Sequence, residues 1–185
     1  MTVDCTALLV IDCQVDFGSP DAEMARRGMD MTAPQAALGN AESLVEAARA
    51  AGVKVIFVRL LTPSGGDEGL CVEGTIGADF IGPRPQAGEA VVSKARYSAF
   101  ARTGLAEQLQ AAGVDTLVLA GLTTECCVAS SAWDGFERDF HIVIASDACA
   151  AYEPDLHRHA LRALELSGAA IITSADLMSA WKKFL

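Results

Sequence analysis

"TLVLAGLTTECCVASSAWDGF", residues 116–136, joins a continuous apolar run to a segment with helical periodicity. The run predicts a buried strand, and the residues after it predict a helix that begins close to Cys126 and Cys127. Five more apolar runs occur along the chain: "ALLVID" (7–12), "KVIFVRLL" (54–61), "AVVSK" (90–94), "IVIASD" (142–147) and "AAIIT" (169–173). Because these runs are continuous rather than alternating, we expect strands that are covered on both faces of a sheet.

Helical patterns separate the apolar runs, at residues 34–51, 100–112, 125–138, 155–167 and 174–184. A glycine follows three of them, as expected at a helix C-terminus: Gly52, Gly113 and Gly168. Ser174 is positioned to cap the last helix. The alternation predicts an α/β fold with a single domain, residues 1–185, built on a doubly wound, mostly parallel six-stranded sheet of the Rossmann-like type with helices on both faces. Residues 62–88, rich in glycine and proline, form one long connection, and loops of that length are often functional.

The composition is that of a globular protein, with 51% apolar and 21% charged residues. The formal net charge of −10 argues against nucleic acid or an anionic membrane as a partner. The apolar runs are much shorter than a membrane span, and "MTVDCTALLVID" lacks the basic start and cleavage site of a signal peptide. We therefore expect a cytoplasmic protein whose partner is a small-molecule substrate.

Six cysteines lie in or beside apolar runs, at Cys5, Cys13, Cys71, Cys126, Cys127 and Cys149. Their spacing is neither that of a disulfide framework nor that of a zinc site, and the three histidines show no paired ligand spacing. We expect free thiols in a reducing compartment.

Reactive side chains follow three of the predicted strands. Asp12 ends the first run, Lys94 ends the third, and the Cys126–Cys127 pair follows the fourth. Ligands of open α/β sheets bind beyond the carboxyl ends of the strands, so these groups are candidates for a common site. A charged residue after a buried strand is also explained by the return of the chain to water. For Asp147, which ends the fifth run, we favour a structural role as an acceptor for backbone amides.

The cysteine pair lies in the first turn of a predicted helix. The partial positive charge there stabilises a thiolate and lowers its pKa, and the free amides can hold an oxyanion. Buried cysteine also packs commonly as a small apolar residue. The spacing alone leaves both roles open.

Four segments resemble those of the isochorismatase-like cysteine hydrolases, a family that includes nicotinamidases, N-carbamoylsarcosine amidase and ureidoacrylate amidohydrolases. They are "LLVIDCQVDF" (8–17), "VVSKARYSAF" (91–100), "LVLAGLTTECCVASSAWDGFERDF" (117–140) and "VIASDAC" (143–149). They span most of the chain in the family's order. The resemblance implies the family's fold, a homo-oligomer, and hydrolysis of a C–N bond in a small amide, carbamoyl or ureido compound.

The resemblance also implies a catalytic triad. Asp12 matches the aspartate of the family's D-x-Q-x-D-F segment, and Lys94 matches the lysine after the third strand. The pattern G-x-x-T-[DE]-x-C-V fits "GLTTECCV" and selects Cys127 rather than Cys126. In the implied mechanism Asp12 accepts the thiol proton, Lys94 stabilises the charges, and Cys127 forms a thioester with the substrate.

By the same resemblance, a cis peptide joins Leu122 to Thr123, and the backbone amides of Thr123 and Cys127 form an oxyanion hole. The residues expected to bind substrate are Gln14, Phe17, Tyr97, Glu73 and Thr75. For Phe17 and Tyr97, plain core packing is the alternative.

The chain departs from the metal-containing nicotinamidases of this family, which carry a D-x-H…H site after the second strand. The corresponding stretch, "VRLLTPSGGDEGLCVEGTIGADF" (58–80), contains no histidine. We therefore expect no metal and no other cofactor.

Three alternatives remain at this point. An isochorismatase-type hydrolase of a vinyl ether would act through Asp12 and would not need the thiol. A dehydrogenase-like nucleotide-binding domain is disfavoured, because "DCQVDFGSP" (12–20) lacks G-x-G-x-x-G. A non-catalytic or thiol-redox protein would use the adjacent cysteines.

Overall fold

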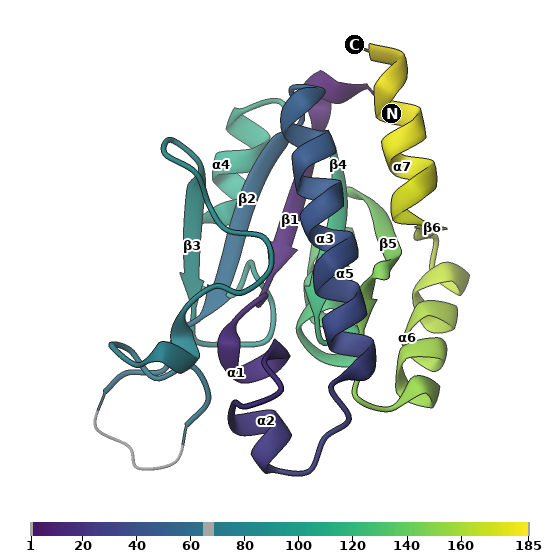
Figure 1. The fold of residues 1–185 in the computed structure, drawn as a ribbon. Helices are drawn as coiled ribbons and strands as arrows, with labels where there is room; N and C mark the ends of the chain where they lie inside the picture. The colour runs from purple at the N-terminus through teal and green to yellow at the C-terminus, as the bar shows by residue number, and fades with distance from the viewer. Residues whose placement is uncertain (1, 65–68, 185) are drawn as a thin grey trace.

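The computed structural model describes residues 2–64 and 69–184. Six parallel strands form one sheet in the order β3-β2-β1-β4-β5-β6 (Figure 1). The strands are β1 (Thr6–Ile11), β2 (Lys54–Leu60), β3 (Ala90–Lys94), β4 (Thr116–Leu122), β5 (His141–Ala150) and β6 (Ala170–Ile172). Each apolar run of the sequence overlaps one of them, so the predicted six-stranded parallel sheet is confirmed.

Helices cover both faces of the sheet, as predicted. The helices α3 (Thr32–Ala50) and α7 (Ser174–Trp181) contribute to one buried cluster, and α4 (Leu105–Ala111), α5 (Ala129–Phe136) and α6 (Pro154–Leu166) contribute to the other (Figure 1). Strands β2 and β3 extend the sheet from one side of β1, and β4 to β6 extend it from the other. The direction of winding therefore reverses at β1 and β4, which is where open α/β sheets bind ligands.

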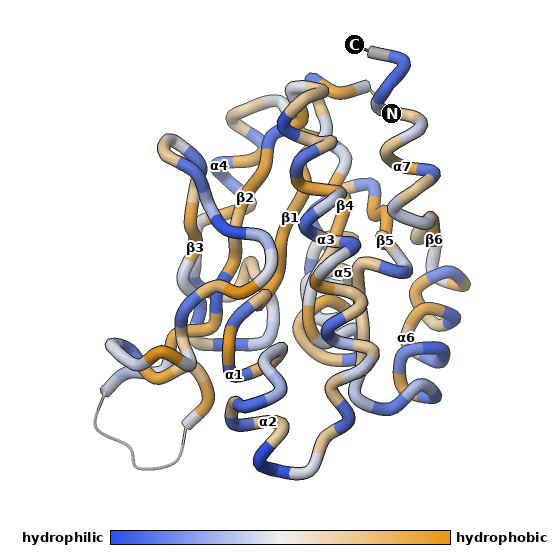
Figure 2. Tube along the Cα trace, viewed as in Figure 1, coloured by the Kyte–Doolittle hydropathy of each residue, from blue (hydrophilic) through white to orange (hydrophobic). Residues whose placement is uncertain are grey.

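Central strand β1 explains why the apolar runs are continuous. Leu8 and Val10 belong to one buried cluster, Leu9 and Ile11 belong to the other, and all four are fully buried. Successive strand side chains point to opposite faces, so a strand between two helical layers needs an apolar residue at every position. Figure 2 shows the result as apolar strands inside amphipathic helices.

Some predicted helix ends are wrong. The helix expected at 100–112 begins only at Leu105, after Gly104 with a left-handed φ of 70°. Ser174 does not cap the last helix, because Thr173 is its N-cap and accepts a hydrogen bond from Asp176 N at 3.2 Å. That helix also stops at Trp181, and a 3₁₀ turn (Lys182–Phe184) follows it.

The region after β1 contains two short helices that were not predicted, α1 (Val15–Gly18) and α2 (Glu23–Arg26). The long connection packs against α1. Asp16 Oδ2 accepts a hydrogen bond from Cys71 N at 2.8 Å, and Val15 N donates to Asp79 O at 2.9 Å. Residues 65–68 of this connection lie outside the described residues.

Gly121 lets β4 approach β1 very closely near its carboxyl end. Its φ is 125°, and a Cβ there would lie 1.9 Å from Ile11 O. The pairing of β4 with β5 also shifts register between Leu119 and Gly121. Only glycine accommodates both this φ and the close approach to Ile11 O.

Among the helices described for this chain, none is long and apolar enough to cross a membrane.

Candidate active site

Asp12, Lys94 and Cys127 come together at the carboxyl ends of the strands. Lys94 Nζ donates to Asp12 Oδ2 at 2.6 Å and to Cys127 Sγ at 3.4 Å. The side chains of Asp12 and Lys94 are fully buried, and Cys127 is 6% exposed. The second carboxylate oxygen of Asp12, Oδ1, is buried without a hydrogen-bond partner within the described part of the chain. The site therefore contains an ion pair, a thiol in contact with the ammonium, and one unused acceptor.

The backbone holds Asp12 in an unusual conformation. It is the first residue after β1 and has a φ of 50°. Its amide still donates to Val58 O at 2.8 Å, and its carbonyl oxygen accepts from Gln14 N at 2.8 Å. A non-glycine residue in the left-handed region is uncommon, and such residues cluster at functional sites.

Cys127 lies in a π-helical turn, Thr124–Val128, between β4 and α5. Val128 N and Cys126 N both donate to Thr123 O at 3.2 Å. The peptide bond between Leu122 and Thr123, where the resemblance implied a cis bond, is cis. Single π turns occur frequently at functional sites.

Two serines, which sequence reasoning missed, connect the segment after Lys94 to this turn and to α5. Ser131 Oγ donates to Cys127 O at 2.7 Å and accepts from Ala99 N at 2.9 Å. Ser98 Oγ donates to Asp134 Oδ2 at 2.6 Å. The i+4 spacing of Ser131 from Cys127 was the available signal, since serine bonds carbonyls one turn back.

Burial and charge set the protonation of the three groups. Burial raises the pKa of the Asp12 carboxyl above its ordinary value of 3.8, against the opposing effect of the Lys94 ammonium. Burial alone would lower the pKa of Lys94, but the charge of Asp12 and the contacts of the ammonium with Asp12 and Cys127 raise it above 10.5. The pair is thus arranged to keep Lys94 charged.

The Cys127 thiol is protonated at rest. The adjacent Cys126 thiol, burial and the Asp12 charge all raise the pKa of Cys127. The expectation that the helix start would lower this pKa is therefore wrong. Contact with Cys127 instead lowers the pKa of Cys126, which is half-buried. Cys127 can act as a nucleophile only if a neighbouring base takes its proton, and Asp12 is the adjacent buried carboxylate, which shares the Lys94 ammonium with the thiol.

Gln14 does not have the role that we predicted. It is fully buried, and its Nε2 donates to Leu60 O and Ala78 O, both at 2.9 Å. Its Oε1 accepts from Leu60 N at 2.8 Å. Both amide protons are used inside the protein, so Gln14 fastens the long connection to β2 instead of facing a substrate.

The other four residues that we expected to bind substrate do not lie in one pocket. Phe17 is 9% exposed, and its carbonyl oxygen accepts from Tyr152 Oη at 3.0 Å. Tyr97 is 66% exposed, so core packing is wrong for it, and it lines a hollow beyond Lys94. Glu73 and Thr75 are exposed and line a separate hollow of about 480 Å³ with neighbouring residues of the long connection and β2. The structure does not place Glu73 or Thr75 in contact with the three central groups.

Tyr152 was missed because β5 is longer than predicted. The strand extends to Ala150, which places Tyr152 just past its carboxyl end. Burial, followed by the charge of Glu125, raises the pKa of Tyr152, so its hydroxyl stays neutral. Asp147 has the structural role that we favoured, because its carboxylate accepts from Ser174 N at 2.6 Å and from Ser174 Oγ at 2.8 Å.

The described residues do not fit the metal site of the nicotinamidases in this family. Within residues 2–64 and 69–184, no three His, Cys, Asp or Glu side chains are grouped so that they could hold a metal ion.

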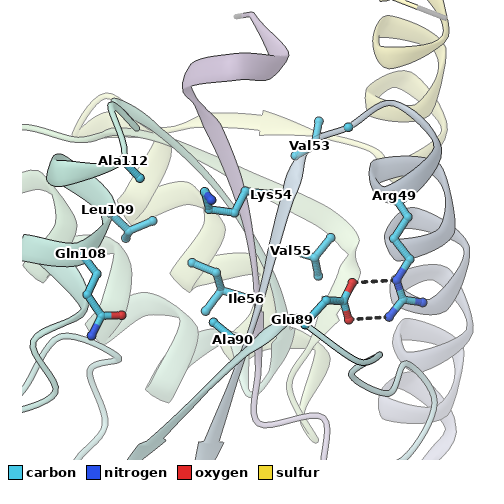
Figure 3. A pocket seen from close by; sticks show the side chains of 12 residues that line it. Arg49, Val53, Lys54, Val55, Ile56, Glu89, Ala90, Gln108, Leu109 and Ala112 are labelled. Carbon is cyan, nitrogen blue, oxygen red and sulfur yellow. Dashed lines mark hydrogen bonds and ion pairs between the residues drawn. The ribbon is translucent and has the colours of Figure 1, made fainter.

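Another hollow, of about 420 Å³, lies at the opposite end of the sheet (Figure 3). Arg49 and Glu89 face each other in its wall, with two hydrogen bonds at 2.9 and 2.8 Å. Arg49 Nη2 also donates to Arg84 O at 2.8 Å. This pair joins α3 to the end of the long connection, so both charged groups already have partners within the protein.

Comparison with known proteins identifies the family of this chain. The sequence model of the isochorismatase domain matches residues 6–176. The chain is 30% identical to ureidoacrylate amidohydrolase RutB of Methylobacterium radiotolerans, over 86% of this chain and 73% of that protein. It is 33% identical to maleamate amidohydrolase of Pseudomonas putida, over 93% of this chain and 84% of that protein.

Solved structures show the same architecture. An isochorismatase-like hydrolase from Alkaliphilus metalliredigens superposes with a TM-score of 0.88 at 27% identity, covering 97% of this chain and 99% of the other. Nicotinamidase/pyrazinamidase PncA from Bacillus subtilis gives a TM-score of 0.81 at 27% identity, covering 93% of this chain and all of the other. The chain therefore belongs to the isochorismatase family.

Proposed function

We propose that this protein is a cysteine amidohydrolase that cleaves the C–N bond of a small amide, carbamoyl or ureido compound. The observation that carries the proposal is the position of Lys94 Nζ, which contacts both the Asp12 carboxylate and the Cys127 thiol in a buried site. A vinyl ether hydrolase would have no need of a thiol in this position.

The steps follow from the protonation states. Asp12, through its free Oδ1, accepts the proton of the Cys127 thiol, and the thiolate attacks the carbonyl carbon. Lys94 stays protonated and balances the negative charge that moves between carboxylate and sulfur. Asp12 then gives the proton to the departing ammonia or amine, which leaves a thioester on Cys127. Water, activated by Asp12, hydrolyses the thioester and restores the thiol.

The tetrahedral intermediate requires donors for its oxyanion. In this proposal they are the backbone amide of Thr123, which precedes the π-helical turn, and that of Cys127, which lies within it. Ser131 supports this arrangement, because its bond to Cys127 O limits rotation of the turn.

The names of the relatives suggest which compounds to test. The two curated relatives are amidohydrolases whose names specify ureidoacrylate and maleamate, and PncA is named a nicotinamidase. A screen for ammonia release should therefore include these three compounds, other small amides and carbamates, and isochorismate as the vinyl ether alternative.

Replacement of the two cysteines tests the mechanism on whichever compound is turned over. Cys127→Ala should abolish ammonia release, and Cys126→Ala should keep most of it. Rapid quenching of the wild-type reaction should give the acyl mass on the peptide that contains Cys127. The proposal is wrong if the two effects are reversed, or if isochorismate is the compound turned over and Cys127→Ala retains that activity.

A further inference from the structure

A hollow of about 420 Å³ opens at the carboxyl ends of β2 and β3, lined by Leu60, Ala95, Arg96 and Tyr97. Leu60 lies opposite Lys94 in the ladder between these strands. The hollow therefore begins at the residues that directly follow the lysine of the proposed triad. Its volume is in the range that holds small organic ligands.

Arg96 is the charged side chain of this hollow. It is exposed, and its Nη1 donates to the carbonyl oxygen of Ala95 at 3.0 Å. No carboxylate among residues 2–64 and 69–184 lies within ion-pair distance of its guanidinium. A guanidinium carries five N–H donors in a planar fork that matches a carboxylate. Most of the donors of Arg96 are therefore available to a ligand.

The site offers an anionic ligand little other positive charge. Lys94 is neutralised by Asp12 at 2.6 Å and is buried with it. The whole chain carries a formal charge of −10, so an approaching anion meets a repulsive average field. The Arg96 guanidinium in the wall of the hollow is a local positive charge that opposes this field.

We propose that Arg96, together with the neighbouring Tyr97 hydroxyl, binds a carboxylate on the substrate, so that amide-bearing acids are preferred over neutral amides. This inference rests on the proposed function, because it specifies the substrate class of the same site. Arg96 binds the acid end of the substrate in the hollow, and the amide end extends past Lys94 to Cys127. Tyr97 is 66% exposed, and its hydroxyl can add a second donor to the same carboxylate.

Alkylation of Cys127 tests the carboxylate preference without a known substrate. Iodoacetate and iodoacetamide both transfer their CH₂ carbon to the sulfur, with formation of an S–C bond, loss of iodide and release of the thiol proton. They differ in carrying a carboxylate or a neutral amide. A Cys126→Ser background removes the adjacent thiol, and mass spectrometry of the Cys127 peptide gives both rates.

Arg96→Gln in this background should lower the ratio of the iodoacetate rate to the iodoacetamide rate about tenfold, as expected for loss of a charge-assisted hydrogen bond. Arg96→Lys, which keeps the charge but not the fork, should give an intermediate ratio. Arg102→Gln is the matched control, because it removes the same charge from an exposed position in the same segment that does not line this hollow. Its ratio should stay within about twofold of the parent.

Turnover gives the second readout once the screen has found a substrate. We compare an amide acid with its neutral diamide, for example succinamate with succinamide, and expect Arg96→Gln to lower the preference for the acid through KM. The inference is overturned if Arg96→Gln leaves the alkylation ratio unchanged, or if Arg102→Gln lowers it equally. A protein that shows the Arg96 effect on alkylation but hydrolyses no amide would overturn the proposed function and not this subsite.

Discussion

At the scale of single residues, the main feature is a buried ion pair that stabilises the fold only weakly. Asp12 and Lys94 are fully buried and 2.6 Å apart, and the cost of removing two charges from water offsets much of their attraction. Asp12 Oδ1 is left without a partner in the described part of the chain, which a stabilising network would have satisfied. The pair is better explained by proton transfer than by stability.

Variants of the pair separate these two roles. Lys94→Met should cost about 3–5 kcal/mol of unfolding free energy, because it leaves the Asp12 carboxyl buried and unpaired. The double variant Asp12→Asn/Lys94→Met should recover much of that loss, since no charge remains buried. Lys94→Met and the double variant should both be inactive. The single variant Asp12→Asn should fold, and its rate should fall about 10²–10⁴-fold. Urea unfolding followed by circular dichroism gives the free energies, and a double variant as unstable as Lys94→Met would contradict this account.

The pH dependence should report Asp12. Its pKa is raised above 3.8 by burial, and it must be ionised to accept the thiol proton, so kcat/KM should rise with pH through a limb that lies above 3.8. The pKa of Lys94 is raised above 10.5, so the rate should not fall until the pH passes that value. A pH–rate profile on an amide that does not titrate in this range measures both limbs.

His157 provides the control for that profile. Burial lowers its pKa below 6.5, and its Nδ1 lies 2.8 Å from Thr124 Oγ1 in the π-helical turn. The acidic limb should persist in His157→Gln. If the limb disappears in that variant, or if the rate declines near the ordinary thiol pKa of 9.0, the assignment to Asp12 is wrong.

At the scale of elements, the strands could be predicted from the sequence and several helix boundaries could not. Each strand lies between two helical layers, which imposes a continuous apolar run that is visible in the sequence. Helices α1 and α2 have four residues each, too few to show a period. The start of α4 is delayed because side chains replace helical hydrogen bonds: Phe100 N donates to Ser98 Oγ, and Leu105 N donates to Thr103 Oγ1.

In the candidate site, too, some residues leave a pattern in the sequence and others do not. Asp12 and Lys94 were predictable because they lie at strand ends and in family motifs, and Cys127 because it lies in a family motif at the start of a helical pattern. The structural role of Gln14 was not, because its partners Leu60 and Ala78 are distant in the sequence. Side chains that depend on such remote partners leave no local pattern.

The two hydrogen bonds of Ser131 connect the segment after Lys94 to the π-helical turn, and a substitution can test this connection. Ser131→Ala leaves Ala99 N and Cys127 O without their buried partner, which should cost about 1–3 kcal/mol in unfolding free energy. The rate should fall as well, because the segments that carry Lys94 and Cys127 lose their connection. The half-buried neighbour Ser130 provides the matched control, and Ser130→Ala should change both quantities little. If the two variants change urea unfolding and kcat equally, Ser131 does not position the segments that carry Lys94 and Cys127.

At the scale of the whole molecule, the groups of the proposed triad come from widely separated parts of the chain, and we predict that their chemistry needs no metal. Residues 58–80 contain no histidine, and the described residues form no group of three candidate ligands. Dialysis against EDTA or a phenanthroline should leave full activity on the substrate found by the screen, with elemental analysis confirming metal-free protein. Loss of activity that stoichiometric zinc, iron or manganese restores would refute this prediction.

The central position of β1 has a further consequence, for the order of folding. Strand β1 pairs in parallel with β2 on one side and with β4 on the other, and Thr6 lies opposite Thr116. Parallel pairing cannot begin with a hairpin, so β1 must wait for a strand more than a hundred residues later in the chain. Asp12 therefore meets Cys127 only when this late, non-local pairing has formed. A nascent chain, or an intermediate that has assembled only β1, β2 and β3, already pairs Asp12 with Lys94 but has no nucleophile in position. Regain of activity during refolding should accordingly coincide with the slowest structural phase, which makes the enzyme's own turnover a reporter of complete folding.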